Sequence, residues 1–320
     1  MSKESSKIEV ARGWSVADIP SQAGRTAVVT GAGGIGYEIA RALAGAGAEV
    51  IIASRNAERG EAAIAALRRE MPRAAVRFEL LDLASLRSVA DFSARLLAGR
   101  ARLDLLVNNA AVMNPPTRQV TEDGYEVQFG ANYLGHFALT LWLMPLLAAG
   151  NTARVVTLSS IAARQGRIAF GDLQSERSYR PMKAYSQSKL ACLMFALELQ
   201  RRSEAGCWGV TSLAAHPGVA RTNLIYNTSG PRSLFGLMRT ALWFLFQPAP
   251  AGALPALYAA TSPDAAGGAY YGPAGLAELR GEPASAMIPA PALDVETSAR
   301  LWEISERLSG AFIPSPAAAR

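Results

Sequence analysis

The stretch TGAGGIG at residues 30–36 decides the fold, because it joins a short apolar run to the start of an amphipathic helix. A glycine-rich turn in this position lets backbone N–H groups approach a pyrophosphate, and the N-terminus of the following helix adds positive potential. A glycine-rich connection without a ligand is the alternative, but the strand before and the helix after favour the first interpretation. We therefore predict a dinucleotide-binding loop made of Gly31, Gly33, Gly34, Ile35 and Gly36.

Outward from this loop, short β-type runs alternate with helical segments. Strands are expected at 26–30, 50–53, 75–80, 103–108, 154–159 and 210–216. Helices are expected at 35–45, 57–71, 85–98, 123–149, 185–204 and 251–260. This alternation is typical of an α/β protein, and right-handed crossovers then place helices on both faces of a parallel sheet. We predict a single Rossmann-type domain with a doubly wound parallel sheet of about seven strands.

The chain divides into three parts. Residues 1–24 are expected to form a loose arm and residues 25–275 the dinucleotide-binding domain. Residues 276–320 are an extension rich in Ala and Pro that is expected to wrap the surface. One segment of the domain, near 230–246, departs from the pattern as an apolar, helix-like insert.

The composition excludes several classes of function. Half of the 320 residues are hydrophobic, which suits a folded domain with a sizeable core. The net charge is +6, but the basic residues are scattered singly, so we expect no nucleic-acid partner. Two cysteines make no disulfide framework, and no metal site is predicted. The polar N-terminus, and apolar runs all shorter than about 18 residues, predict a cytoplasmic protein without a transmembrane segment.

The end of the second predicted strand bears on which dinucleotide would bind. A site for NAD has an acidic residue here, which binds the ribose 2′-hydroxyl. This chain instead reads Ala53-Ser54-Arg55-Asn56, and Arg55 offers a guanidinium to a 2′-phosphate. We therefore predict NADP as the cofactor, with Ser54 and Arg55 at this end of the site. An Arg55 that is simply exposed in a loop, with NAD as cofactor, is the alternative.

A tyrosine and a lysine one helical turn apart supply proton chemistry. Tyr185 and Lys189 share one face of a predicted helix, and a neighbouring ammonium lowers the pKa of a phenol. A second pair at the same spacing, Tyr179 and Lys183, encloses Pro181, which disfavours helical geometry there. We therefore predict that Tyr185 is the residue that gives or takes the proton.

Four further segments follow one another in a recognisable order. They read Asn108-Asn109-Ala110-Ala111, Asn132-Tyr133-Leu134-Gly135-His136-Phe137, Ser159-Ser160-Ile161-Ala162 and His216-Pro217-Gly218-Val219-Ala220-Arg221-Thr222. Together with the glycine loop and the Tyr185–Lys189 pair, they resemble the motifs of the short-chain dehydrogenase/reductase family over residues 25–275. Within that family, the chain is most similar to the retinol-dehydrogenase-like branch.

The resemblance implies roles for individual residues. Tyr185 would be the general acid in carbonyl reduction, Lys189 would hold the nicotinamide ribose and lower the tyrosine pKa, and Ser160 would bind the substrate oxygen. Asn132 would hold a water molecule in the proton relay. The other cofactor-binding residues implied in this way are Asp82, Leu83, Asn109, Ala110, Pro217, Gly218, Val219 and Thr222.

The resemblance also implies an activity. The chain is expected to be an NAD(P)-dependent oxidoreductase that interconverts an alcohol and its aldehyde or ketone by hydride transfer. In this family, the segment after the sixth strand covers the substrate, and here that segment, near 230–246, is apolar. We therefore expect an apolar lid and a hydrophobic substrate. A subunit interface and a helix on a membrane surface are the alternatives for this segment.

One departure from the family's motifs, in the glycine loop, is the reason for considering a second function. The family's loop reads TGxxxGxG, whereas TGAGGIG is one residue shorter. A protein that keeps the fold but acts as a cofactor-sensing or interaction protein is therefore the alternative function. An epimerase or dehydratase of the extended branch is disfavoured by the loop that begins at His216. As partners, we expect a small apolar substrate and a homodimer or homotetramer formed through the helices near 123–149 and 185–204.

Overall fold

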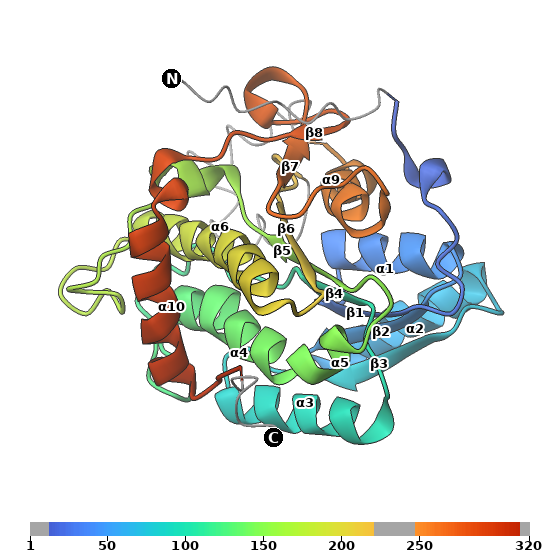
Figure 1. The fold of residues 1–320 in the computed structure, drawn as a ribbon, viewed down its shortest axis with the longest axis horizontal. Helices are drawn as coiled ribbons and strands as arrows, with labels where there is room; N and C mark the ends of the chain where they lie inside the picture. Colours follow the sequence, from blue (N-terminus) through green and yellow to red (C-terminus); the bar gives the residue numbers. More distant parts are fainter. Residues whose placement is uncertain (1–12, 221–246, 314–320) are drawn as a thin grey trace.

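The computed structural model describes residues 13–220 and 247–313, and within them a single sheet separates two layers of helices (Figure 1). The strand order is β3-β2-β1-β4-β5-β6-β7-β8. The strands are β1 (Thr26–Thr30), β2 (Glu49–Ser54), β3 (Val76–Leu80), β4 (Leu105–Asn108), β5 (Arg154–Leu158), β6 (Thr211–Ala215), β7 (Tyr270–Pro273) and β8 (Pro283–Ser285). All pairs are parallel except β7 with β8, which is antiparallel. The predicted doubly wound parallel sheet is confirmed, with an added antiparallel edge strand.

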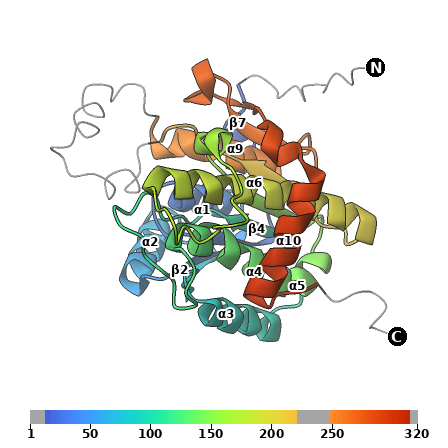
Figure 2. The same ribbon diagram turned by 90° about the vertical axis from the view of Figure 1, so that its left-hand side faces the viewer.

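Two hydrophobic cores lie on the two faces of the sheet. Strand side chains alternate between them, so that Val28 joins one core and its neighbour Val29 the other. One face is covered by α1 (Ile35–Gly45), α2 (Ala57–Glu70) and α9 (Ala249–Thr261). The other is covered by α3 (Leu86–Gly99), α4 (Gly135–Trp142), α5 (Met144–Ala148) and α6 (Pro181–Gly206). Figure 2 shows α10 (Val295–Ser309) running across α4 and α6 on the outside of this second layer.

Helix α6 begins earlier than predicted, at Pro181 rather than at Tyr185. Proline fits the first position of a helix, because the N–H group that it lacks would have no partner within the helix there. Tyr179 therefore precedes the helix, while Lys183 lies in its first turn. The prediction that Tyr179 and Lys183 do not form a helical pair is confirmed, although Lys183 is not in a loop.

The helix predicted at 123–149 is interrupted in the structure. A π-helical turn, η2 (Phe129–Leu134), precedes α4, and α5 follows as a separate short helix with Pro145 in its first turn. The π-helical turn widens the hydrogen-bonding ring and shifts carbonyl groups out of the regular ladder, as is common at functional sites. All of its six residues are buried, and Asn132 is one of them.

The C-terminal extension does more than wrap the surface. It supplies β8 and α10, and α10 buries Leu301 and Trp302 in the core that contains α4 and α6. The Trp302 ring lies 4.9 Å from the Phe137 ring and 5.8 Å from the Phe195 ring, between centroids. The extension was expected on the surface because its Ala and Pro content hides the period of the apolar residues in α10.

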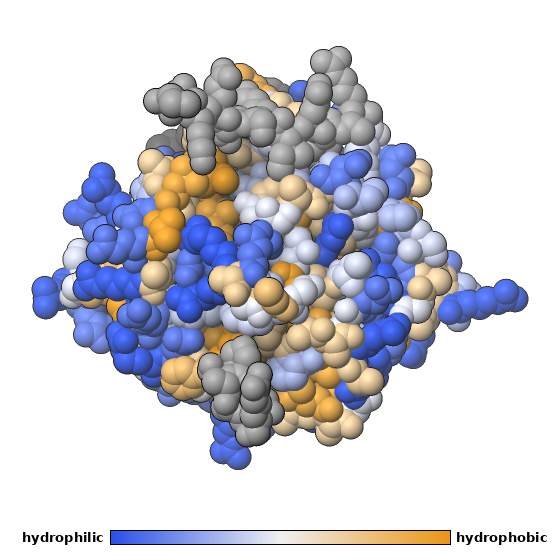
Figure 3. All heavy atoms as spheres, viewed as in Figure 1, coloured by the Kyte–Doolittle hydropathy of each residue, from blue (hydrophilic) through white to orange (hydrophobic). Residues whose placement is uncertain are grey.

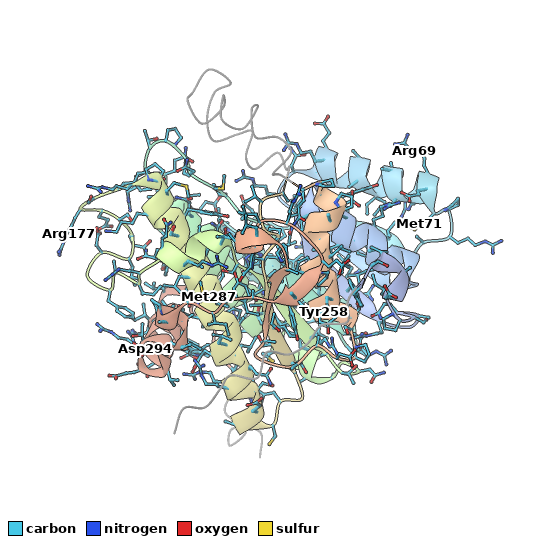
Figure 4. All side chains as sticks on the ribbon, turned by 90° about the horizontal axis from the view of Figure 1, so that it is seen from above. Arg69, Met71, Arg177, Tyr258, Met287 and Asp294 are labelled. Carbon is cyan, nitrogen blue, oxygen red and sulfur yellow. The ribbon has the colours of Figure 1, made fainter. Side chains whose placement is uncertain are left out.

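The N-terminal arm also packs on the domain where the structure describes it. Trp14 is buried and meets the ring of Tyr258 on α9 edge to face, with 5.3 Å between the ring centroids. Figure 4 shows Tyr258 near the middle of the molecule, with Arg69 and Met71 at the end of α2 and Asp294 before α10 at opposite sides.

The outer surface carries polar and apolar side chains side by side. On the face seen in Figure 3, hydrophobic areas are separate and are interrupted by hydrophilic residues. Within the two described stretches of the chain, no helix has the length and apolar character needed to span a membrane.

Candidate active site

A cavity of about 610 Å³ opens at the carboxyl ends of the central strands. It lies where β1 has β2 on one side and β4 on the other, so the direction of the strand order reverses at this point. Ligands of doubly wound sheets bind at such a switch point, because the loops on either side separate and leave a crevice. The cavity is therefore the candidate site for a dinucleotide and its substrate.

Most of the predicted cofactor residues line this cavity. They are Gly31, Gly33, Gly34, Ile35, Ser54, Arg55, Asp82, Leu83, Asn109, Ala110, Tyr185, Lys189 and Pro217. Gly36, Gly218 and Val219 are not in its lining, and Thr222 and the segment near 230–246 lie outside the described residues. Predicted residues from distant parts of the sequence thus come together in one place.

The glycine loop keeps a tight turn although it is one residue short. Gly31 has φ +96°, and Gly34 precedes α1 with φ +54° and no side chain to cap the helix. A Cβ atom on Gly36 would lie 2.3 Å from the carbonyl oxygen of Gly31, so only glycine fits there. The N-terminus of α1, which has no side-chain cap, begins in the lining of the cavity at Ile35 and suits a phosphate group.

Replacing Gly36 tests the importance of this close approach. We expect Gly36→Ala to push the loop from α1 and to lower NADPH affinity by about tenfold or more, because the new methyl group would also lie 2.5 Å from Nδ2 of Asn109. Gly99→Ala is the matched control, because nothing lies within 4 Å of its Cβ position. Fluorescence titration measures the NADPH affinity of both variants. Equal affinities of Gly36→Ala and Gly99→Ala would contradict the conclusion that only glycine fits at position 36.

A buried hydrogen-bond network connects the glycine loop to η2 and α4. The hydroxyl oxygen of Thr30 accepts from the backbone N–H groups of Asn109 and Ala110, each at 2.9 Å. Nε2 of His136 lies 2.9 Å from the same oxygen, and Nδ1 lies 2.8 Å from the carbonyl oxygen of Asn132. Burial lowers the pKa of His136 to about 4, so the ring is neutral at pH 7. Its Nδ1–H then donates to Asn132, and Nε2 accepts from Thr30.

The side chain of Asn132 is fully engaged with protein groups. Its Oδ1 accepts from the backbone N–H of Val112 at 2.6 Å, while Nδ2 donates to the carbonyl oxygen of Val112 at 2.9 Å and to Ser188 at 3.0 Å. Asn132 therefore fixes the backbone of Val112, which lines the cavity. Its role in holding a water molecule stays a prediction.

The predicted tyrosine and lysine lie side by side on α6 and line the cavity. Tyr185 is 6% exposed and Lys189 is 3% exposed, and Nζ of Lys189 donates to the carbonyl oxygen of Leu158 at 2.9 Å. Burial raises the pKa of Tyr185 to about 12, and a hydrogen bond with Ser160 opposes this only in part. Burial also lowers the pKa of the Lys189 ammonium.

The structure does not show the expected lowering of the Tyr185 pKa by Lys189, because burial raises this pKa instead. Desolvation of the phenol outweighs every favourable interaction, and the Lys189 charge is not among the causes of the shift. Tyr185 is consequently a protonated phenol at neutral pH, which is the form that a general acid needs.

The third predicted catalytic residue, Ser160, begins a short helix beside the cavity. Ser160 precedes η3 (Ile161–Gln165), and its Oγ accepts from the N–H of Ala162 at 3.2 Å. Its carbonyl oxygen accepts from the hydroxyl group of Tyr270 at 3.4 Å. Ser160 thus bonds to Tyr185 on one side and is held by β7 on the other.

Sequence reasoning missed several residues of the cavity. Arg59, Asn56 and Tyr37 line its end near Arg55, and Val112 and Ser159 line its other end. The signal for Arg59 was present, because Asn56 is a strong N-cap residue and its side chain accepts from the Arg59 N–H at 2.7 Å. That cap fixes Arg59 in the first turn of α2.

Ser159 is a second residue whose structural role was not predicted from the sequence. It was interpreted only as the last residue of a strand, yet its Oγ donates to the carbonyl oxygen of Lys189 at 2.7 Å and ties β5 to α6. The pairing depends on how α6 crosses the sheet, which no local pattern reveals.

A dinucleotide crevice with a buried tyrosine and lysine beside it defines a nicotinamide-dependent oxidoreductase of the Rossmann type. Comparison with known proteins gives the family. A model described as short chain dehydrogenase matches residues 25–231, so the chain belongs to the short-chain dehydrogenase family.

Named relatives place the chain within that family. It is 42% identical over 300 residues to retinol dehydrogenase 13 of Mus musculus, covering 91% of this chain and 86% of that protein. It is 43% identical over 303 residues to polyprenol dehydrogenase of Mus musculus, covering 92% and 86%. The similarity to the retinol-dehydrogenase-like branch is confirmed.

Solved structures share the fold over most of their length. A crystal structure of an uncharacterised protein from Mycobacterium paratuberculosis has a TM-score of 0.78 and 39% identity, covering 94% of this chain and 99% of that one. The complex of Pseudomonas aeruginosa RhlG with NADP has a TM-score of 0.62 and 25% identity, covering 78% and 94%. The protein is an NAD(P)-dependent oxidoreductase acting on alcohols or carbonyls, and the alternative of a non-catalytic sensor is not favoured.

Proposed function

We propose that the protein is an NADP-dependent oxidoreductase for a hydrophobic aldehyde or ketone and the corresponding alcohol, with Tyr185 as general acid and base. The observation that carries this proposal is the burial of Tyr185 and Lys189 side by side in the lining of the cavity. The bound nicotinamide supplies or accepts the hydride. The protein's own part is to orient the carbonyl oxygen and to move one proton at the oxygen of Tyr185.

The residues around Tyr185 support these separate roles of the cofactor and the protein. Ser160 bonds to the phenol and would share the substrate oxygen with it. Lys189 would bind the nicotinamide ribose, since its side chain lines the cavity one turn along α6 from Tyr185. In alcohol oxidation Tyr185 must first lose its proton, so oxidation should be faster at alkaline pH. Carbonyl reduction uses the protonated phenol, which is the form present at neutral pH.

The preference for NADP rests on two arginines at one end of the cavity. Arg55 follows β2, Arg59 lies in the first turn of α2, and both line the site beside Ser54. Two guanidinium groups at this end favour a 2′-phosphate over a free 2′-hydroxyl. The solved complex of RhlG with NADP supports the same choice.

Replacing Arg55 tests this preference directly. We expect Arg55→Ala to weaken NADPH binding by about tenfold and NADH binding much less, because a hydrogen bond to a charged phosphate is lost only with NADPH. Arg59→Ala should act in the same direction. Arg69→Ala is the control, because Arg69 is exposed at the far end of α2 (Figure 4). Equal losses for the two nucleotides would mean that neither arginine binds the 2′-phosphate.

The preference for a hydrophobic substrate rests on the relatives and on the apolar composition of the segment near 230–246. Two relatives are named retinol dehydrogenase and polyprenol dehydrogenase. Steady-state rates with a long-chain apolar aldehyde should exceed those with a short polar aldehyde in kcat/KM, and the reverse order would contradict the proposal.

The assembly and location of the protein remain proposals. Helix α10 covers much of α4 and α6, where a dimer contact was predicted, so a homodimer or homotetramer would use the outer side of α10 or another surface. Analytical ultracentrifugation measures this state. We retain a cytoplasmic location, without nucleic acid as a partner, on the composition of the chain.

A further inference from the structure

A carboxylate outside the lining of the cavity connects two segments that border it. Oε2 of Glu278 accepts from Nε2 of His216 at 2.8 Å and pairs with the guanidinium of Arg164 at 2.5 Å. Oε1 accepts from the backbone N–H of Met287 at 3.0 Å. The side chain is 19% exposed, so the carboxylate has three partners in a half-buried setting.

One partner holds the loop that borders the cofactor side of the cavity. His216 follows β6 directly and precedes the loop at residues 217–219, and its Nδ1 accepts from the N–H of Gly218 at 3.2 Å. Nε2 must then carry the proton that is donated to Glu278. Burial lowers the pKa of His216, which keeps the ring in this neutral form. Glu278 therefore fixes the orientation of His216 and, through it, of the loop.

The other partner holds the segment that begins at Ser160. Arg164 lies in η3, directly after Ser160, and its ion pair with Glu278 anchors that short helix. Tyr270 adds a second connection, because its hydroxyl group donates to Ser160 and its ring lies 5.1 Å from the ring of His216. The substrate side and the cofactor side of the cavity are thus joined through the Glu278 carboxylate and, in addition, through Tyr270.

The backbone around Glu278 is strained in a way that favours this role. Ala277 and Glu278 have φ angles of +52° and +58°, which residues with side chains rarely adopt. The carbonyl oxygen of the next residue, Leu279, accepts from the N–H of Val219 at 2.9 Å and would lie 2.3 Å from a Cβ atom on Gly218. Strain of this kind persists where the surrounding contacts determine it, and it clusters at functional sites.

We propose that Glu278 is a positioning residue that sets the 217–219 loop and the Ser160 segment in a fixed relation across the active site. The proposal rests on the proposed function. Glu278 touches no reacting atom; it acts through His216 on the cofactor side and through Arg164 on the substrate side. Loss of its charge should therefore impair both cofactor binding and turnover, while each partner should affect mainly one of them.

The experiment separates these two effects in the full-length protein. NADPH affinity is measured by fluorescence titration, and kcat is measured with a long-chain apolar aldehyde at saturating NADPH. We expect Glu278→Gln to lower NADPH affinity by about tenfold and kcat several-fold, as for lost hydrogen bonds to a charged group. His216→Gln should lower mainly the affinity, and Arg164→Gln mainly kcat. Glu282→Gln is the matched control, because Glu282 is an exposed carboxylate in the same segment.

Three results would overturn the proposal. Wild-type values for Glu278→Gln would show that the carboxylate positions nothing. Losses that match the fraction of unfolded protein, measured by circular dichroism, would show a purely structural role. If Glu278→Gln does not fold, the two partner variants decide. Equal effects of His216→Gln and Arg164→Gln on NADPH affinity and on kcat would contradict the assignment of His216 to the cofactor side and Arg164 to the substrate side. A wild-type protein that binds neither NADPH nor NADH would instead contradict the proposed function, and with it any role of Glu278 in that function.

Discussion

Tyr185→Phe is expected to lower kcat for carbonyl reduction by about a hundredfold to ten-thousandfold, the usual contribution of a positioned general acid. The change removes one oxygen atom from a side chain that is 6% exposed, so the fold and the cavity should be kept. NADPH affinity should therefore change little. Stopped-flow measurement of NADPH oxidation, with fluorescence titration of the same preparation, tests both expectations.

Tyr179, the tyrosine of the second pair at the same spacing, is the control for this prediction. Tyr179 donates its hydroxyl hydrogen to the carbonyl oxygen of Pro115 at 2.8 Å and lies before α6, away from Lys189. Tyr179→Phe should keep nearly full activity. A fully active Tyr185→Phe, or an inactive but folded Tyr179→Phe, would mean that Tyr185 is not the general acid.

The sequence was sufficient for the parts of the fold that depend on local pattern. Helix α1 was predicted with its observed bounds, because a glycine loop precedes it and Gly45 ends its apolar period. Strand β1 was also predicted with its observed bounds and β5 to within one residue, since each is a short run with β-branched residues between turn residues. The cofactor side of the cavity followed from the same loops, because the carboxyl ends of parallel strands meet at one edge of the sheet.

The parts that were missed depend on contacts between distant residues. Strand β8 has three residues and is defined only by its pairing with β7. Glu278 belongs to no motif, and its role arises where η5 (Leu276–Glu278) meets His216 and Arg164. The pKa of Tyr185 also could not be predicted from its spacing to Lys189, because the burial that raises it is a property of the whole fold.

Trp302→Ala is expected to lower the free energy of unfolding by about 3–5 kcal/mol, the usual cost of truncating a buried aromatic side chain. Trp302 is 2% exposed and packs on Phe137 of α4 and Phe195 of α6. The guanidinium of Arg202 lies 4.5 Å from its ring centre, so the substitution also removes a cation–π contact. Chemical denaturation followed by circular dichroism measures the change.

The control for this prediction lies on the same helix. Glu303 is the next residue of α10 and is exposed, so Glu303→Ala should change the unfolding free energy by less than about 0.5 kcal/mol. Equal stabilities of Trp302→Ala and the wild type would mean that α10 does not pack on α4 and α6 in solution. In that case the apolar faces of α4 and α6 would be open, and the homodimer through these helices would again be the expected assembly. A large loss of stability would instead make α10 an integral part of the domain.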